Sequence, residues 1–410
     1  MNQSLDGKIL VTIERLIAGG LGMAHSGGRT YLVHGAAPGD KAAIVPTRAS
    51  GGVTFAEIVD LIEASPVRVA PPCPHYGICG GCDFQHLSYQ AQLDAKVEFV
   101  RDALRRIAGI AEPVEISITA SPDQWAYRSR AEWRWDPQTR AFGYFERGSH
   151  TVRDVPSCPV LTPPLNRLLG DVRARVSAAT DDAMPTEWYA ASGERAPTLI
   201  PELPGLGKRS IMVTVADVDY QFDAGVFFQT NLAILPAMIA SVLKGAGTPE
   251  IDEEEPRRSV AIDLYSGVGL FAIPLARRFD RVFAVETSRG ATAFLRRNVE
   301  RAGVGDVHTA ALPCAVWIKQ RAKSVGKVDV VVVDPPRIGV DVETLDGLVQ
   351  LQAPRIVYVS CDPATLARDL KVLLSVGYRL DAVEAFDMFP QTHHVEIVAH
   401  LSLPESGEQA

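Results

Sequence analysis

Two side chains in the last fifty residues could carry out covalent chemistry. Cys361 follows the apolar run Ile356 to Val359 and precedes a predicted helix, in Ser360-Cys361-Asp362-Pro363. The dipole at a helix N-terminus favours a thiolate, which suits a nucleophile, although a lone cysteine is more often a core residue. Glu396 lies in an apolar segment, where a carboxylate is unusual unless it is paired or functional. It could accept a proton.

Four other cysteines are spaced like metal ligands. Cys73, Cys79 and Cys82 form C-x5-C-G-G-C, and Cys158 follows much later. Four thiolates can complete one tetrahedral zinc site or one [4Fe–4S] cluster. Structural zinc usually has paired C-x2-4-C units and only one pair here complies, so the spacing favours the cluster. The spacing also differs from the C-x3-C-x2-C of radical SAM enzymes. Cys314 is not near any other candidate ligand in the sequence and is expected in the core.

A glycine-containing turn, Asp263 to Gly269, follows the apolar run Val260 to Leu264 and opens a helix. Ligands bind at this position in parallel sheets. Glu286 ends the next strand about 20 residues later, where a carboxylate can bind ribose hydroxyls. Tyr265 stands where G-x-G-x-x-G has its first glycine, which favours an S-adenosylmethionine (SAM) enzyme over a dinucleotide enzyme. Asp334-Pro335-Pro336-Arg337 brings a second acid to the same edge.

These residues require a doubly wound parallel sheet to position them. After the middle of the chain, apolar β-branched runs alternate with helical patterns, as buried parallel strands do. The runs are Val260 to Leu264, Val282 to Val285, Val328 to Val333 and Ile356 to Val359.

About the first 60 residues predict five short strands with glycine-rich turns, and hence a small barrel of a kind that often binds oligonucleotides. The domain boundary is expected near Ala64, and Ser88 to Ala108 has the caps and apolar spacing of a helix. His393 and His394 could bind a metal or form a hydrogen-bond network. Without a third ligand in view, the network is preferred.

A hairpin is predicted from Trp125 to Val155, with its turn at Asp136 to Thr139. Arg128, Arg130 and Arg134 share one side of its first strand because side chains alternate across a strand. Basic and aromatic groups together suit single-stranded RNA. A solvated amphipathic hairpin would give the same pattern.

The composition bounds the possible classes of protein. The chain has 410 residues, 47% of them hydrophobic and 22% charged, typical of two or three soluble globular domains. No apolar stretch could span a bilayer, and Met1 to Asp6 shows no targeting signal, so we expect a cytoplasmic protein without a membrane partner. The net charge of −8 argues against indiscriminate nucleic-acid coating but permits a local basic face.

On six motifs taken together, the chain resembles the bacterial RNA uracil-C5 methyltransferases, which are SAM-dependent Rossmann-like enzymes. The resemblance spans nearly the whole chain, and the N-terminal stretch resembles a TRAM domain. The motifs are Cys73 to Cys82 with Cys158, Phe227-Phe228-Gln229-Thr230-Asn231, Asp263 to Gly269, Asp334 to Arg337, Ser360 to Pro363 and His394 to Glu396.

The resemblance implies a role for each candidate residue. Cys361 would be the nucleophile that adds to uracil C6, and Glu396 the base that removes the C5 proton. The partner would be RNA, with the target uridine splayed out of a loop, ribosomal RNA favoured over transfer RNA, and the enzyme a monomer. The expected SAM contacts are Gln229, Tyr265, Gly267, Glu286 and Asp334, and the expected [4Fe–4S] ligands are Cys73, Cys79, Cys82 and Cys158.

The expected architecture is α/β with three domains. Residues 1–63 would form a TRAM-like barrel that binds RNA, 64–225 a central α+β domain with the cysteine cluster and an RNA-facing hairpin, and 226–405 a Rossmann-like SAM-dependent domain. Three positions depart from the family pattern: Leu270 replaces an asparagine, Ser266 a frequent cysteine and Asp362 an asparagine. A carboxylate at Asp362 could raise the pKa of the thiol.

Two other functions fit parts of the sequence. An acid-Pro-Pro motif also occurs in enzymes that methylate exocyclic amino groups, but these need no cysteine. A non-catalytic RNA-binding protein would not need Cys361 together with Glu396. The pair therefore favours uracil methylation.

Overall fold

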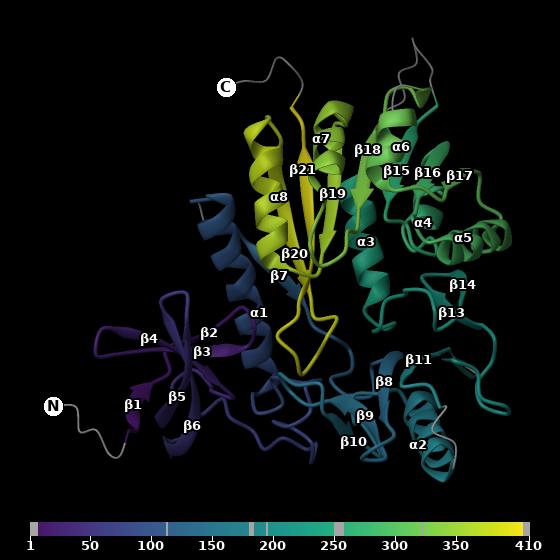
Figure 1. The fold of residues 1–410 in the computed structure, drawn as a ribbon. Helices are drawn as coiled ribbons and strands as arrows, with labels where there is room; N and C mark the ends of the chain where they lie inside the picture. Colours follow the sequence, from purple (N-terminus) through teal and green to yellow (C-terminus); the bar gives the residue numbers. More distant parts are fainter. Residues whose placement is uncertain are drawn as a thin grey trace.

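The computed structural model describes residues 7–111, 114–179, 184–193, 196–249, 258–321 and 324–404. Its strands form sheets of six, five, two and eight strands, in that order along most of the chain (Figure 1). The expectation for Met1 to Asp6 lies outside the described residues. Within them, no helix combines the length and apolarity needed to cross a membrane.

The N-terminal sheet has six strands where the sequence predicts five. The glycine-rich stretch is a turn at Gly19 and Gly20, both with positive φ, and it joins two strands rather than lying within one. Ile13, Val33 and Ile44 are fully buried in the core of this sheet. Its order is β1-β5-β6-β4-β3-β2, with β1 (Ile9–Thr12), β2 (Arg15–Ile17), β3 (Leu21–Ser26), β4 (Arg29–His34), β5 (Lys41–Ser50) and β6 (Val53–Glu63).

The helix predicted over Ser88 to Ala108 is confirmed. Helix α1 (Tyr89–Ala103) begins after Ser88, whose hydroxyl accepts a hydrogen bond from the Ala91 N–H at 3.4 Å. It continues as one π-helical turn, η1 (Leu104–Ala108), and ends at Gly109 with φ +76°. The left-handed conformation there is easily adopted by glycine.

The predicted hairpin belongs to a five-stranded sheet. Trp133 and Trp135 are buried against α2 (Pro163–Ala178), as the alternation predicts. The arginines of the other side do not form an open basic surface, because they have partners within the protein: Arg130 donates to the Ala224 carbonyl at 3.1 Å and Arg134 pairs with Glu132. The order is β10-β9-β8-β11-β12, with β8 (Arg130–Asp136), β9 (Ala141–Phe145), β10 (Val152–Asp154), β11 (Glu187–Ser192) and β12 (Pro197–Ile200).

The large C-terminal sheet contains all four predicted apolar runs, but it is mixed rather than parallel. β21 runs antiparallel to both of its neighbours, and β7, from before the hairpin, adds a parallel strand at the edge. A run of apolar residues indicates that a strand is buried, but it does not indicate whether the strand runs parallel or antiparallel to its neighbours. The order is β17 (Asp306–Ala310), β16 (Arg281–Val285), β15 (Val260–Leu264), β18 (Val330–Val333), β19 (Arg355–Ser360), β21 (Glu396–Ser402), β20 (Arg379–Phe386) and β7 (Ile116–Thr119).

Helices cover both faces of this sheet (Figure 1). One face packs against α3 (Leu235–Ala246), α4 (Ala272–Leu275), α5 (Arg289–Ala302) and the hairpin of β13 (Ile211–Val215) and β14 (Val218–Phe222). The other packs against α6 (Cys314–Arg321), α7 (Val342–Leu351), α8 (Pro363–Ser375) and the end of α1. Cys314 is buried in this second core, as expected.

Candidate active site and cysteine cavity

Cys361 and Glu396 come together at one edge of the C-terminal sheet. Ser360, the last residue of β19, is paired with Ile397 of the antiparallel β21. The next residue outward on each strand is therefore Cys361 on one and Glu396 on the other. Asp334 follows β18, the strand on the other side of β19, so the three side chains that the sequence predicts at this edge share it.

The two carboxyl groups of the edge are held in surroundings that disfavour their charge. Glu396 is 3% exposed, and burial raises its pKa well above the ordinary value, with Asp334 adding to the rise and Arg337 opposing it. Burial alone raises the pKa of Asp334 to about 7. Carboxyl groups with such raised pKa values are suited to exchange protons near neutral pH.

The Cys361 thiol behaves differently from the sequence-based expectation. Burial raises its pKa to about 12, with Glu396 adding to the rise and Arg337 opposing it. The helix N-terminus does not reverse this, because Asp362 caps it by accepting hydrogen bonds from the N–H groups of Ala364 and Thr365 at 2.9 and 2.8 Å. The Asp362 charge also raises the thiol pKa, as predicted.

Arg337, the last residue of the Asp334 to Arg337 motif, also lies at this edge, although its residue type alone predicts no role for it. Its charge lowers the pKa of both Cys361 and Glu396. A guanidinium nitrogen lies 3.4 Å from Nε2 of His394, whose pKa burial lowers to about 3. A neutral His394 can accept this hydrogen bond and hold the guanidinium near the sheet edge.

The turn after β15 is shaped by positive φ and by one carboxylate. Tyr265 and Gly267 have φ values of +62° and +53°. Glu286, at the end of β16, accepts hydrogen bonds from the N–H groups of Gly267 at 3.0 Å and Ser288 at 2.7 Å. The structure thus brings three of the predicted SAM contacts together, and the Tyr265 hydroxyl lies 3.4 Å from a carboxylate oxygen of Asp341.

Several buried polar atoms in the predicted SAM motifs have no hydrogen-bond partner of ordinary geometry. They include the side-chain oxygen of Gln229, both carboxylate oxygens of Asp263 and the hydroxyl of Ser266. Asp263 is fully buried, and burial raises its pKa well above the ordinary value. Buried polar groups normally have partners. Unpartnered donors and acceptors on these two segments fit a site for a polar ligand such as SAM.

The four predicted cluster cysteines line one cavity. The cavity has a volume of about 30 Å³. Its wall contains Cys73, Cys79, Cys82 and Cys158. Burial raises the pKa of Cys82 to about 12 and also raises that of Cys79 and Cys158, whereas Arg128 in the same wall opposes the rise.

Among the described residues, no three His, Cys, Asp or Glu side chains are gathered as ligands of one metal ion. The four thiols are partly buried and lie in the wall of one cavity.

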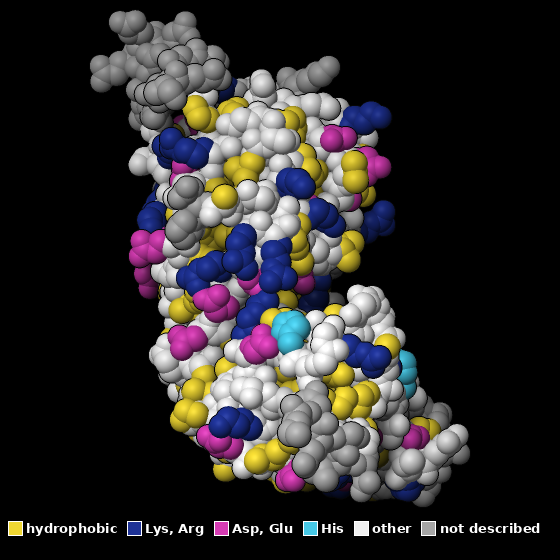
Figure 2. All heavy atoms as spheres, turned by 90° about the vertical axis from the view of Figure 1, so that its left-hand side faces the viewer, with side chains coloured by type: hydrophobic (Ala, Val, Ile, Leu, Met, Phe, Trp, Pro, Cys, Tyr) yellow, Lys and Arg dark blue, Asp and Glu magenta, His cyan; other side chains and the backbone are white. Residues whose placement is uncertain are grey.

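A groove lies between the N-terminal sheet, the end of α1 and the start of α8. It has a volume of about 590 Å³ and is lined by β2 and β3, by the end of α1 and by Pro363 and Ala364, which lie two and three residues after Cys361. Lys and Arg side chains gather across the middle of this side of the molecule (Figure 2). Arg101, Arg105 and Arg106 are 43%, 61% and 62% exposed at the end of α1 and in η1.

Comparison with known proteins gives consistent likenesses. The family model described as tRNA (Uracil-5-)-methyltransferase matches residues 208–403. The chain is 33% identical to a 23S rRNA (uracil(1939)-C(5))-methyltransferase RlmD of Pseudomonas putida, over 94% of this chain and 92% of that one. The protein of the same description from Alkalilimnicola ehrlichii is 32% identical, over 95% of each chain.

A solved structure agrees over the same extent. The Pyrococcus abyssi tRNA (uracil-54, C5)-methyltransferase, in complex with S-adenosyl-L-homocysteine, is 27% identical with a TM-score of 0.69, over 96% of this chain and all of that one. The sequence likeness to the bacterial relatives and this shared mixed α/β fold lead to one conclusion. The chain belongs to the RNA uracil-C5 methyltransferase family and is a SAM-dependent enzyme of that activity.

Proposed function

We propose that the enzyme methylates C5 of one uridine in 23S ribosomal RNA through a covalent bond between Cys361 and uracil C6. The observation that carries this proposal is the meeting of Cys361 and Glu396 at the sheet edge, next to Asp334. A methyltransferase acting on an exocyclic amino group would need neither the thiol nor its carboxyl neighbour.

The reaction needs a nucleophile because uracil C5 is too weakly nucleophilic to be methylated directly. Addition of the Cys361 thiolate to C6 places electron density on C5. The buried thiol must first lose its proton, and Arg337 is the cation at the edge that favours the thiolate. SAM, when bound, supplies the electrophilic methyl group that C5 takes up.

Product release needs a base. After methyl transfer, C5 carries both the new methyl group and its original proton. Glu396 removes that proton, the electrons of the C5–H bond form the C5–C6 double bond, and the C6–S bond breaks to release the Cys361 thiolate. The burial that raises the pKa of Glu396 makes its carboxylate a stronger proton acceptor.

The cofactor contacts are proposed from the same geometry. Gln229, Tyr265, Gly267 and Glu286 would hold SAM, and Asp334 would contact SAM and help to orient the base. The unpartnered oxygens of Gln229 and Asp263 support a ligand there.

The cysteine cavity would hold a [4Fe–4S] cluster. Cys73, Cys79, Cys82 and Cys158 would be its ligands, and the cluster would cross-link the 73–82 loop to the start of α2. The shared cavity and the four free, partly buried thiols support this assignment, and the cluster would need only a structural role.

The groove would receive RNA on its way to Cys361. Arg15 and Arg106 in its lining suit the phosphate backbone, and the target uridine must leave its stack to reach the sheet edge. We assign RNA binding to a TRAM-like domain at residues 1–63, the cluster and hairpin to a central domain at 64–225, and methyl transfer to 226–405, in a monomeric enzyme. The 23S rRNA methyltransferase activity of the two bacterial relatives supports ribosomal RNA as the substrate.

The test incubates the anaerobically purified enzyme with methyl-labelled SAM and RNA from a strain that lacks the enzyme. Transfer RNA and ribosomal RNA are tested separately. A single 5-methyluridine mapped in 23S RNA is expected. Label in transfer RNA alone would overturn the ribosomal substrate but keep the reaction. No label in either RNA, with SAM binding verified, would overturn uracil methylation of these RNAs.

A further inference from the structure

The segment from residue 387 to 395 joins β20 to β21 and ends directly before Glu396. It forms no helix or strand, and Gln391 at its centre adopts a left-handed φ of +69°. The β21 ladder begins at Glu396, which is paired with Phe386 of β20, the residue before Asp387. The chain before Glu396 depends on the contacts that this segment makes with other parts of the molecule.

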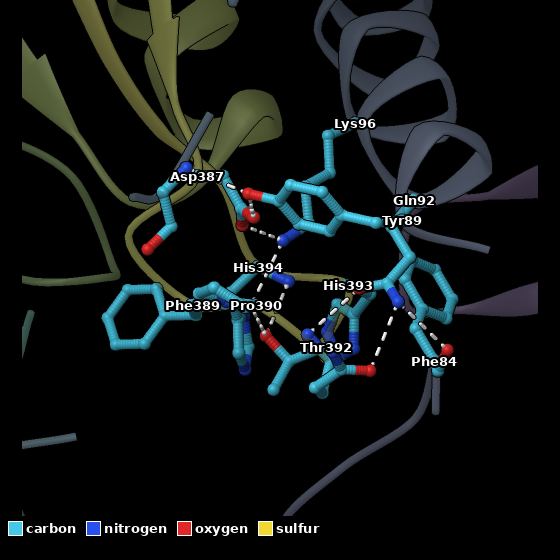
Figure 3. A network of polar contacts seen from close by, with 12 residues as sticks. Phe84, Tyr89, Gln92, Lys96, Asp387, Phe389, Pro390, Thr392, His393 and His394 are labelled. Carbon is cyan, nitrogen blue, oxygen red and sulfur yellow. Dashed lines mark hydrogen bonds and ion pairs between the residues drawn. The ribbon is translucent and has the colours of Figure 1, made fainter. Parts of the chain in front are cut away.

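One of these contacts is a fully buried ion pair. The Lys96 ammonium of α1 donates a hydrogen bond to the Asp387 carboxylate, and both side chains have zero exposure (Figure 3). Lys96 also donates to the Phe389 carbonyl at 3.0 Å, and the Tyr89 hydroxyl donates to Asp387 at 2.7 Å. Buried charges require such saturation of their hydrogen bonds. Two side chains of α1 thus fix the start of the segment.

A second contact fixes the middle of the segment. The Gln92 side chain exchanges two hydrogen bonds with Gln391, donating to its side-chain oxygen at 3.1 Å and accepting from its backbone N–H at 2.9 Å. The Gln391 carbonyl accepts from the N–H groups of Asp83 and Phe84, both at 3.0 Å. The strained residue is therefore held on its side chain, its N–H and its carbonyl.

A third contact fixes the end of the segment next to the catalytic edge. Nδ1 of His393 lies 2.6 Å from a carboxylate oxygen of Asp83, the residue that follows Cys82. The neighbouring His394 contacts Arg337. This is the network preferred for the two histidines from the sequence. It leads from the cysteine loop to the guanidinium beside Cys361 and Glu396.

From this geometry we infer that Lys96 and Tyr89, acting through Asp387, are positioning residues for Glu396. By fixing the 387–395 segment, they determine the position of the Glu396 carboxyl group relative to the uracil bound to Cys361. The inference rests on the proposed function, since it assumes that Glu396 removes the C5 proton. It predicts a defect in one step of the reaction rather than in all of them.

The test measures methyl transfer and release separately. Single-turnover transfer of a labelled methyl group to RNA reports the first step, and the fraction of enzyme cross-linked to RNA on a denaturing gel reports the second. For Lys96→Met we expect transfer within about threefold of the wild type and release slowed about 10- to 100-fold, the loss that a misplacement of about 1 Å produces. Cross-linked enzyme should accumulate.

Because Lys96→Met leaves a buried carboxylate without its cation, it could prevent folding, so Tyr89→Phe provides a second variant. This variant removes the hydroxyl that donates a hydrogen bond to Asp387. We expect release slowed about threefold or more, with methyl transfer unchanged. The matched control is Tyr378→Phe, which removes a buried hydrogen bond to the Ala353 carbonyl at 2.9 Å, away from this segment. The control should accumulate no more cross-linked enzyme than the wild type.

Glu396→Gln separates the inference from the function on which it rests. If Glu396→Gln accumulates cross-linked enzyme and neither Tyr89→Phe nor a folded Lys96→Met does, the positioning role is wrong and the proposed function stands. If Glu396→Gln itself accumulates none while Cys361 is intact, the proposed role of Glu396 fails, and the inference fails with it.

Discussion

Cys361 and Glu396 each lie one residue beyond Ser360 and Ile397, which are paired across two antiparallel strands. The reversal of β21 produces this relationship. In a parallel sheet the first residue of a strand lies at the opposite edge from the carboxyl ends of its neighbours. Here the first residue of β21 lies beside the residue that follows the last of β19. This places the proposed nucleophile and the proposed proton acceptor next to each other.

Replacement of Cys361 by alanine should abolish turnover and leave SAM binding unchanged. The thiol is the group that would activate uracil C5, and it has no place among the expected cofactor contacts. Methyl incorporation into RNA and calorimetric titration with SAM would measure the two properties. Turnover comparable to the wild type in Cys361→Ala would refute the nucleophile assignment.

Glu396→Gln should trap the enzyme on its RNA after methyl transfer. An amide cannot remove the C5 proton, so the C6–S bond cannot break at the normal rate. A band of RNA-linked protein carrying the labelled methyl group is expected on a denaturing gel. The double variant Cys361→Ala with Glu396→Gln should give no such band, and a band from it would point to another attachment site.

Asp334 should make the free enzyme less stable as the pH rises. Its folded-state pKa is about 7 against an ordinary value of 3.8, so the folded protein holds this proton more tightly than the unfolded chain does. The contribution of Asp334 to the free energy of unfolding therefore decreases as the pH rises from 3.8 to about 7 and stays constant above that. The total decrease is on the order of 4 kcal/mol.

In Asp334→Asn this loss should disappear. Denaturant unfolding of both proteins at pH 4.5 and pH 8 would measure this. At pH 8 the free energy of unfolding of Asp334→Asn should exceed that of the wild type. The exposed Asp346 of α7 gives a control, Asp346→Asn, which should follow the wild type. A wild-type pH dependence in Asp334→Asn would contradict the raised pKa.

Glu286→Gln should weaken SAM binding by about 10- to 100-fold. The carboxylate accepts one backbone hydrogen bond from Gly267 in the turn after β15 and one from Ser288 at the start of α5, and bonds to a charged group contribute about 1.5–3 kcal/mol each. Calorimetry with SAM would measure the affinity. Glu300→Gln, on the exposed side of α5, should bind normally. Equal affinities in the two variants would show that Glu286 does not support the site.

Cys158→Ala should lose iron and lower the unfolding temperature. Cys158 is the one of the four cavity thiols that lies far along the chain from the others, so its loss would open the proposed cross-link. Iron analysis and the visible absorption of anaerobically purified protein would test this. Cys314→Ala, buried in another core, should retain iron. Wild-type iron content in Cys158→Ala would rule it out as a ligand.

Much of the fold could be predicted from apolar runs. The run Val260 to Leu264 coincides with β15, and the serine before α1 forms the predicted cap. These features depend on a few neighbouring residues, which the sequence displays directly. The direction of β21 could not be predicted, because burial patterns are the same for both directions.

The sequence identifies residues that meet at this sheet edge, but not the electrostatic surroundings in which they lie. The sequence places Cys361 before a helix, and this favours a thiolate, but burial and the carboxyl neighbours raise the thiol pKa. Arg128 was expected on an RNA-facing surface and lies in the wall of the cysteine cavity. Both differences arise from tertiary packing that brings distant segments together. Short-range periodicity contains no information about such contacts.

The contact between Lys96 and Asp387 spans 291 residues and so has a consequence for biosynthesis. When α1 leaves the ribosome, the carboxylate that neutralises its central lysine has not yet been translated, and neither has β20, to which β7 pairs. Contacts of such long range form late. The cysteine-bearing half of the chain must therefore wait for the last strands before its interior closes. A nascent chain interrupted before β20 would lack Asp387 as well, and would keep a charged, incompletely covered helix accessible to chaperones and proteases.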